Sequence, residues 1–414
     1  MPYLHVLERH AEEAAELWPL RARASAAPHY KLKDLARLDE RIEAHLSGLR
    51  VSPAEAKPIL AALELTHAGS AFARAAAALA AKDSTGFARV LAALEENAEL
   101  VPGVVGALAW LPLETTEWAV RALMHASCPP ILRRFALSAH VAHGRDPGIA
   151  LDDALRATSA PLRATAIDGA GRLGRTDLLD EIREDMASET SSVREAAAFS
   201  SALLGEPSAA DELWKHADVG RDTGRDALTL ALSRMGHEEG LSRLQGWMRD
   251  DASARAALIG AGVLGAAEAL PHVMERIEVP ALARVAGEAF HRITGVAITG
   301  RLKRARPAEG SAAGANDDPD DAAVAPDPDG DLAWPDAASV RAKAASWLRT
   351  APRGERLLLG EPITEARCDA VLVRGTQRLR AAAAIERVSI GAGPLVDVGR
   401  PAYRRAARGA TGSL

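Results

Sequence analysis

The stretch "SAPLRATAIDGAGRLGRTDLL", residues 159–179, contains the pattern that decides the fold. In it, Gly174 follows Arg163 by eleven residues. If this spacing belonged to a single site it would occur once, whereas in a structural repeat it would recur along the chain at a fixed period. The spacing recurs, with ten residues in one case, in Arg133–Gly144, Arg194–Gly205, Arg225–Gly236, Arg255–Gly265, Arg284–Gly295 and Arg380–Gly391. Consecutive glycines between 144 and 295 lie 29 to 31 residues apart. The interval therefore marks a repeat of about 30 residues.

Each repeat has the pattern of two helices. The first, as in "VREAAAFSSALLG" (193–205), has apolar residues at three- and four-residue spacing and ends at a glycine that can adopt the left-handed cap conformation. The second, as in "RTDLLDEIREDM" (175–186), has its apolar residues on one face. One pair has too little apolar area to fold alone, so neighbouring pairs must stack. We expect an all-α protein, an α-solenoid of short helix pairs.

The repeat and its interruptions predict five segments. Acidic and proline-rich composition without hydrophobic periodicity predicts that the segment before the last repeat is disordered. The predicted segments are an N-terminal helical cap (1–60), the repeat solenoid (61–304), the disordered acidic linker (305–336), C-terminal repeat-like helices (337–398) and a basic tail (399–414). Within the cap, Leu35, Leu38, Ile42, Leu46 and Leu49 form an apolar stripe, and Asp39 is expected on another face of that helix.

Composition excludes several classes of protein. A formal charge of −6 and a pI near 6.1 weigh against a dedicated nucleic-acid binder. Cys128 and Cys368 stand 240 positions apart, without a CxxC or a neighbouring set of Cys and His, which weighs against zinc ligation and a disulfide framework. The N-terminus lacks the apolar core of a signal peptide, and no run of eighteen apolar residues occurs. We therefore expect a cytoplasmic protein without a membrane span.

No motif indicates catalysis, a cofactor or a metal. The chain lacks HExxH, GxSxG, a Walker loop and a GxGxxG that opens a βαβ unit. "DPDGD" (327–331) resembles the start of a calcium loop, but Leu332 and Ala338 occupy the sixth and twelfth places, where glycine and a bidentate acid are needed. The motif is therefore interpreted as part of the solvated linker. "RLKRAR" (301–306) is a basic cluster that either contacts nucleic acid or balances this linker.

Two sets of residues are candidates for partner binding. The first is the arginine ladder, which comprises Arg133, Arg163, Arg194, Arg225, Arg255 and Arg284, one from each repeat. Guanidinium groups bind phosphates and acidic peptides, although arginines at this place could equally pair with acids of the neighbouring repeat. The second set is Trp214 and Trp247, on the second helices of successive repeats, where they either anchor a partner or pack at the edge of the core.

A repeat of about 30 residues is shorter than that of ankyrin (about 33), tetratricopeptide (about 34) or longer HEAT and armadillo units (about 40 to 47). The pairs Leu162-Arg163 and Leu173-Gly174 resemble the short HEAT-like repeat of bilin lyases and bacterial scaffold proteins. The chain also resembles an uncharacterised bacterial HEAT-like family in the motifs of residues 18–21, 28–30 and 35–49, "FHRITG" (290–295), "LAWPD" (332–336), "GERLLLG" (354–360) and "QRLRAAAA" (377–384).

This resemblance implies a role in type VI secretion, because members of the family are encoded among type VI secretion genes, near spike-tip and effector-handling proteins. We therefore expect a non-enzymatic scaffold or adaptor that binds a protein partner on its concave face, with Trp214, Trp247, Arg163, Arg194, Arg225 and Arg255 as the candidate contacts. Two alternatives stay open, a nucleic-acid-binding HEAT-like protein and an enzyme that acts on a small molecule, as bilin lyases do.

Overall fold

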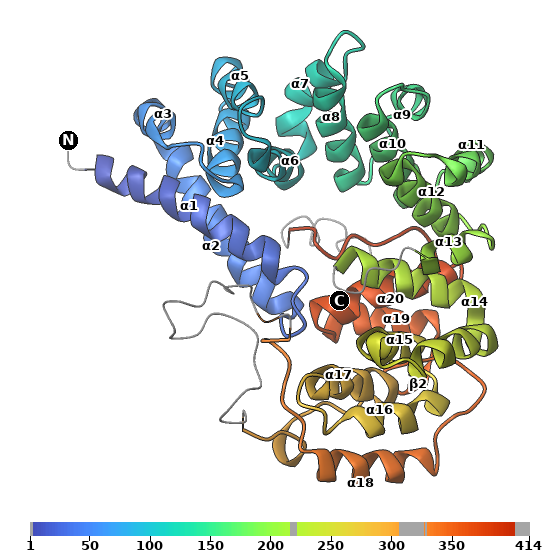
Figure 1. Cartoon of the computed structure of the whole chain (residues 1–414). Coiled ribbons are helices and arrows are strands. Elements are labelled where there is room, and N and C mark those ends of the chain that lie inside the picture. Colours follow the sequence, from blue (N-terminus) through green and yellow to red (C-terminus); the bar gives the residue numbers. More distant parts are fainter. Residues whose placement is uncertain (1–2, 216–221, 306–326, 328, 402–414) are drawn as a thin grey trace. The chain divides into compact units, whose positions relative to one another are not determined.

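The computed structural model describes residues 3–215, 222–305, 327 and 329–401 (Figure 1). These residues form twenty α-helices, several short 3-10 turns and one two-stranded antiparallel hairpin. The all-α class predicted from the sequence is thereby confirmed. The described chain divides into two compact units, one of residues 3–200 and 397–401 and the other of residues 201–396.

The helices of the first unit follow one another with short connections. They are α1 (Leu4–Ala24), α2 (Leu32–Val51), α3 (Pro53–Ala62), α4 (Ala68–Ala80), α5 (Ser84–Ala93), α6 (Val101–Trp110), α7 (Leu113–Met124), α8 (Pro130–His143), α9 (Ile149–Leu155), α10 (Ala160–Leu173), α11 (Leu179–Glu184) and α12 (Ser191–Leu203), within which the boundary between the units falls.

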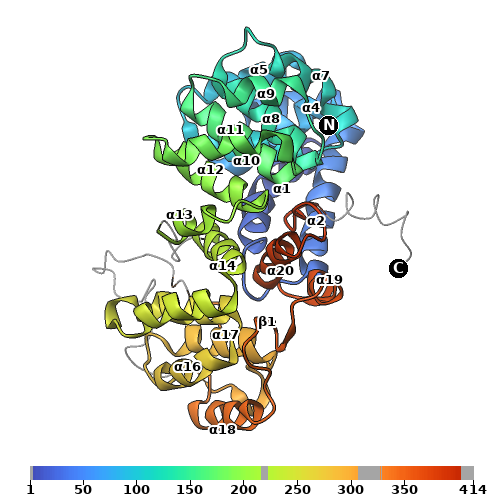
Figure 2. The same ribbon diagram turned by 90° about the vertical axis from the view of Figure 1, so that its right-hand side faces the viewer.

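The second unit contains eight helices and the hairpin. They are α13 (Ala209–Lys215), α14 (Asp222–Met248), α15 (Ala254–Leu264), α16 (Leu270–Arg276), α17 (Ala283–Thr294), α18 (Ala337–Leu348), β1 (Leu357–Leu358), β2 (Glu361–Pro362), α19 (Glu365–Arg374) and α20 (Gln377–Ser389). Helices α19 and α20 lie side by side (Figures 1 and 2), and α20 also packs on α14.

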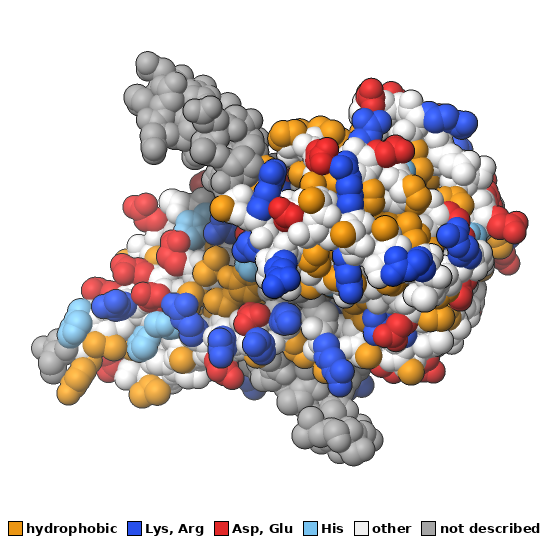
Figure 3. Space-filling view, turned by 90° about the horizontal axis from the view of Figure 1, so that it is seen from below, with side chains coloured by type: hydrophobic (Ala, Val, Ile, Leu, Met, Phe, Trp, Pro, Cys, Tyr) orange, Lys and Arg blue, Asp and Glu red, His pale blue; other side chains and the backbone are white. Residues whose placement is uncertain are grey.

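Acidic and basic side chains are intermixed on the face shown in Figure 3. Among the described helices, none combines the length and the apolar character that a membrane crossing needs.

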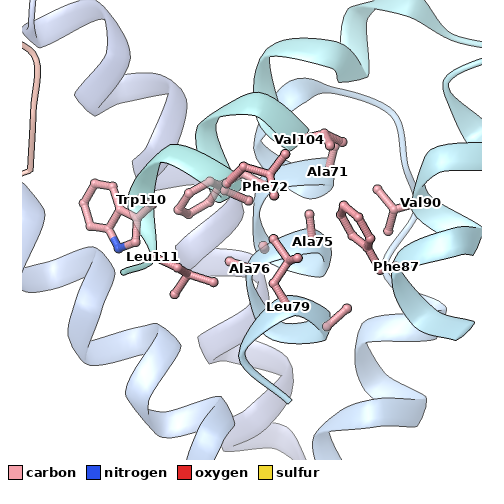
Figure 4. Packing of buried hydrophobic residues seen from close by; sticks show 14 of the residues in the cluster. Ala71, Phe72, Ala75, Ala76, Leu79, Phe87, Val90, Val104, Trp110 and Leu111 are labelled. Carbon is pink, nitrogen blue, oxygen red and sulfur yellow. The ribbon is translucent and has the colours of Figure 1, made fainter. Parts of the chain in front are cut away.

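The core of the first unit is built around α4 (Figure 4). This helix is rich in alanine, and its Phe72 stacks on Trp18 of α1 at a ring-centroid distance of 5.1 Å and meets Trp110 of α6 edge-on at 5.7 Å. Small residues allow the backbones to approach closely: a Cβ added to Gly69 would lie 1.9 Å from the carbonyl oxygen of Ala15. Aromatic rings therefore fill the space that the alanine helix leaves open.

The predicted apolar stripe of α2 is confirmed, because its five leucine and isoleucine side chains are all buried. The prediction for Asp39 is wrong. Its carboxylate is only 2% exposed, and it accepts a hydrogen bond of 2.8 Å from the Nε–H of Arg21, on α1. A carboxylate can be buried on a helix face when an equally buried guanidinium compensates its charge.

The glycines of the repeat behave as predicted. Every one that ends a first helix has a positive φ, from +62° to +104°: Gly144, Gly174, Gly205, Gly236, Gly265, Gly295 and Gly391. Gly236 lies inside α14, where its φ of 79° and ψ of −170° separate two helical arms. The pair of helices expected for this repeat is therefore present, joined by a kink.

The hairpin β1–β2 docks on the ends of two repeat helices. The amide of Leu357 donates to the carbonyl of Gly265 at 3.2 Å, and the amide of Leu359 donates to the backbone carbonyl of Arg292 at 3.0 Å. The guanidinium of Arg367 then donates to the carbonyls of Leu358 and Leu359. A side chain at position 265 would collide with this hairpin, because its Cβ would lie 1.9 Å from the Leu357 oxygen.

The predicted acidic linker, residues 305–336, extends too far toward the C-terminus. Residues 306–326 and 328 lie outside the described residues, but 327 and 329–336 are folded onto the second unit. Trp334 is 7% exposed, and the guanidinium of Arg284 lies 4.7 Å from its ring centroid. Arg304 lies on the same ring at 5.8 Å, and its amide donates to the Trp334 carbonyl at 3.0 Å. Tertiary contacts with arginines order a stretch whose composition alone is typical of disorder.

Candidate functional site

Four arginines of the ladder form ion pairs inside the protein. Arg163 pairs with Asp185, at 2.9 Å from Nε to Oδ2, and Arg225 approaches Glu288 at 3.6 Å. Burial raises the pKa of Asp185, although the charge of Arg163 lowers it in part. Arg255 and Arg284 pair with acids of the DPDGD motif, as described next. Their charges are engaged by carboxylates of this chain, which favours the structural role over phosphate binding.

The DPDGD motif supplies two of these carboxylates. Both oxygens of Asp329, which is 3% exposed, accept from the guanidinium of Arg255 at 2.7 and 2.6 Å. Asp327 accepts from Arg284 at 2.9 Å. The interpretation of this motif as solvated linker is therefore wrong for these two residues, because their carboxylates form ion pairs with repeat arginines. Among the described residues, no group of three or more His, Cys, Asp or Glu side chains could hold a metal ion.

The other two ladder arginines lie in different surroundings. Arg194 donates to the Ser188 carbonyl at 2.6 Å, so it ties the start of its helix to the preceding loop. The Nε of Arg133 is buried, and no described group accepts its hydrogen bond. Nothing in these contacts resembles a row of guanidinium groups that face a common ligand.

Trp214 and Trp247 contact each other. Their rings stack at a centroid distance of 4.1 Å with an angle of 17° between the planes, and both are half-buried at the edge of the second core. The sequence placed them at equivalent positions of successive repeats, and the stack shows that these second helices, α13 and the C-terminal arm of α14, are neighbours. Both rings are therefore used, at least in part, in packing within the second unit.

A cavity of about 500 Å³ lies among α2, α3, α4 and α5 in the first unit. Its size falls in the range of about 300 to 1,000 Å³ that is typical of ligand sites. The apolar lining comes mostly from alanine, with two leucines and a proline. The lining residues are Leu49, Arg50, Pro53, Ala54, Ala56, Lys57, Leu60, Ala61, Arg74, Ala77, Ala78, Ala80, Ala81, Asp83, Gly86 and Arg89.

Four basic side chains and one acid line this cavity, which is therefore positive. Lys57 pairs with Asp83 at 2.9 Å, and Arg50 pairs with Glu43, which is not a lining residue. Arg74 is half-buried, and its Nη1 donates to the Leu63 carbonyl at 3.0 Å. Burial lowers the pKa of Arg74, and the charge of Arg89 lowers it further.

Arg89 differs from the other three basic residues. Its side chain is exposed, and within the described part of the chain no hydrogen bond or ion pair engages its guanidinium. An anionic group in the cavity could therefore bind Arg89 without breaking an existing contact. The same group would relieve the repulsion between Arg89 and Arg74.

The cavity is suited to binding rather than to proton transfer. Its one carboxylate, Asp83, has a lowered pKa because it accepts the amide of Gly86 and pairs with Lys57. A carboxylate that is held ionised in this way is a poor general acid, and no lining residue offers a hydroxyl, thiol or imidazole nucleophile.

The sequence did not single out this site. The signals in the sequence that could have indicated it are the alanine run at 73–81 and the basic residues at 74 and 89. Taken alone, these residues are typical of ordinary helices, and they line a cavity only because α2 and α3 lie beside them.

Comparisons with protein-family models, with curated proteins and with solved structures found no match to this chain.

Proposed function

We propose that this protein is a non-enzymatic scaffold or adaptor that binds a protein partner. The observation that carries the proposal is the cavity among α2, α3, α4 and α5, with its apolar lining and its four basic side chains. The proposed ligand is a segment of the partner that presents an apolar side chain next to Asp or Glu. Recognition of acidic motifs by arginine clusters is a recurring mode of peptide binding.

The two parts of this ligand match two parts of the cavity. Alanine methyl groups leave room for an apolar side chain, whose burial contributes about 1.5 to 3 kcal/mol. The acidic neighbour would bind Arg89, whose guanidinium makes no hydrogen bond or ion pair among the described residues, and would lie near Arg74. We further propose that the repeated helix pairs stack as an α-solenoid, an architecture that serves binding of extended partners.

The cellular setting of the proposal rests on the family resemblance. A cytoplasmic adaptor of type VI secretion would hold a spike component or an effector before loading. The concave-face contacts predicted at Trp214, Trp247, Arg163, Arg194, Arg225 and Arg255 are not needed for this proposal, because several of these side chains are engaged inside the protein.

The experiment is affinity recovery of the tagged full chain from lysate of its native host, with and without nuclease. Three variants are compared with the wild type. Ala81→Trp fills the cavity from an exposed lining position, Arg89→Glu reverses the free charge, and Arg37→Glu reverses an exposed charge on α2 outside the lining. We expect partners resistant to nuclease that are lost with Ala81→Trp and Arg89→Glu but kept with Arg37→Glu.

Two outcomes would contradict the proposal. Equal recovery of the same partner by all four proteins would place binding elsewhere on the chain. Loss of all bound material on nuclease treatment would favour the nucleic-acid alternative, and a mobility-shift titration with a steep salt dependence would then establish it. Circular dichroism of each variant checks that the helices are intact.

A further inference from the structure

One aliphatic side chain of the first unit projects into solvent far from the cavity. Ile149, in the first turn of α9, is 77% exposed. Figure 1 shows α9 on the other side of α7 and α8 from α3, α4 and α5, which line the cavity. A single exposed apolar side chain is common on protein surfaces, so its neighbours decide what it can bind.

The neighbour of Ile149 on α9 is a carboxylate. Asp153 follows it by four residues, and residues at this spacing lie on the same face of a helix. The buried residues of α9, Leu151, Ala154 and Leu155, lie on its other side. Asp153 is exposed, and among the described residues no hydrogen bond or ion pair engages its carboxylate. α9 therefore presents an apolar side chain beside an unpaired acid.

The surroundings of α9 carry an excess of negative charge. Three aspartates share the guanidinium of Arg175: Asp146 at 3.0 Å, Asp152 at 2.9 Å and Asp177 at 2.7 Å. Arg156 pairs with Glu181 at 2.7 Å, and Arg145 is exposed. Residues 145–156, Arg175 and the acids paired with these arginines thus contain five carboxylates and three guanidiniums.

The cavity has the opposite excess. Its lining contains four basic side chains, and the acids that pair with them are Asp83, in the lining, and Glu43, beside it. Four cations thus face two carboxylates. The apolar part of the lining, mostly alanine, has room for an aliphatic side chain. The surface of α9 and the cavity are therefore complementary in charge and in polarity.

We propose that α9 of one copy of this chain occupies the cavity of a second copy. Ile149 enters the apolar lining, and the carboxylate of Asp153 binds Arg89. This inference rests on the proposed function, because it takes the cavity as a site for an apolar side chain next to an acid. The two contact surfaces are different parts of one unit, so the interface is heterologous and copies join head to tail.

The first test is sedimentation velocity of the purified full chain over a range of concentrations. An interface with one apolar anchor and one ion pair is small, so the mean sedimentation coefficient should rise with concentration and fall again on dilution. Ile149→Ser should lose this association. Association of Ile149→Ser like that of the wild type would overturn the proposal.

Ile131→Ser is the matched control. Ile131 is also exposed in the first turn of a helix, α8, but no carboxylate lies within four residues of it. This variant should associate like the wild type. Equal loss of association in Ile131→Ser and Ile149→Ser would overturn the proposal, because it would show a general effect of surface polarity. Circular dichroism checks that each variant is folded.

Mixing two variants tests the head-to-tail geometry. Ala81→Trp blocks the cavity but keeps α9, and Ile149→Ser keeps the cavity but lacks the anchor. Each should be monomeric alone, and the mixture should form dimers of one copy of each and nothing larger. A mixture that stays monomeric would overturn the proposal. Association that is lost in Ala81→Trp but kept in Ile149→Ser would also overturn it, since another segment would then fill the cavity.

A charge exchange tests the ion pair. Arg89→Glu and Asp153→Arg should each abolish association, because each brings like charges together in the interface. The chain that carries both substitutions restores opposite charges and should associate again. A double variant that remains monomeric would overturn the pairing of Asp153 with Arg89.

Self-association and partner binding can fail separately. Association is measured on purified protein, whereas the partner of the proposed function is recovered from lysate. A wild-type chain that is monomeric at every concentration, yet recovers a partner that Ala81→Trp loses, would overturn this inference and leave the proposed function intact. Association through the cavity without any recovered partner would support this inference and contradict the proposed adaptor.

Discussion

The Nε–H of Arg21 donates to Oδ1 of Asp39 at 2.8 Å, and this ion pair joins α1 to α2 with side chains that are 9% and 2% exposed. The pair explains why α1 carries a buried arginine and α2 a buried aspartate on the faces that pack together. Arg21 also lies on the ring of Trp110, at 5.7 Å from its centroid, so the pair is part of the core of the first unit.

Removing one partner of this pair should cost far more than removing both. Asp39→Asn leaves the buried Arg21 without counter-charge, and we expect a loss of about 3 to 5 kcal/mol in the free energy of unfolding. The double variant Arg21→Met with Asp39→Leu should be less destabilised than Asp39→Asn. Urea denaturation measures both. Glu40→Gln, at the exposed neighbour, is the control and should change stability by less than about 0.5 kcal/mol.

Gly265 and Gly205 should respond differently to the same substitution. Both have a positive φ, of 71° and 104°, so alanine costs about 1 kcal/mol at either position. At position 265 the new Cβ would also lie 1.9 Å from the Leu357 oxygen, whereas nothing lies within 4 Å at position 205. We expect Gly265→Ala to lose at least about twice as much stability as Gly205→Ala in denaturant titrations. Equal losses would show that the hairpin is not docked on the cap.

Asp329 should stabilise the second unit through its two bonds to Arg255. Asp329→Asn weakens this fork and leaves a half-buried guanidinium without its carboxylate, and we expect a loss of about 1 to 3 kcal/mol. Chemical denaturation checks this value. The control is Glu355→Gln, which removes an exposed charge of the same unit. Asp329→Asn as stable as the control would mean that the DPDGD motif is solvated after all.

Four histidines should make stability depend on pH between 7 and 5. Burial lowers the pKa of four histidines below the value of 6.5 that the unfolded chain retains: His45, His140, His272 and His291. The unfolded state therefore binds protons in this range that the folded state does not. Their stabilising contribution is present above pH 6.5 and is lost as the pH falls toward the lowered values.

Denaturant titrations at several pH values measure this dependence. His291→Gln removes one of these four titrating groups, so it should reduce the slope of stability against pH in this window. His125→Gln, at an exposed histidine, is the matched control. A His291→Gln variant with an unchanged slope would show that His291 does not contribute to the pH dependence.

Helices and their ends followed from local patterns. The interval from Arg163 to Gly174 predicted a first helix ended by a left-handed glycine, and α10 ends at Gly174 with φ of 75°. Such patterns can be predicted from the sequence because helix periodicity and capping depend on neighbours within one or two turns. The ion-pair partners of the arginines could not be predicted in this way, because they are distant in sequence. Asp329, for example, is 74 residues from Arg255.

The cavity could not be predicted for the same reason. Arg74 and Arg89 look like surface residues of α4 and α5, and only the packing of α2 and α3 makes them line a cavity.

The amino-acid sequence by itself determined the all-α class, the repeat of about 30 residues and the glycine caps, because backbone propensity and apolar periodicity are local. Tertiary structure alone decided which charges are buried, which arginines are paired and where a cavity lies. Those features depend on the distances between segments far apart in the chain, and on how much water each charge loses when they meet.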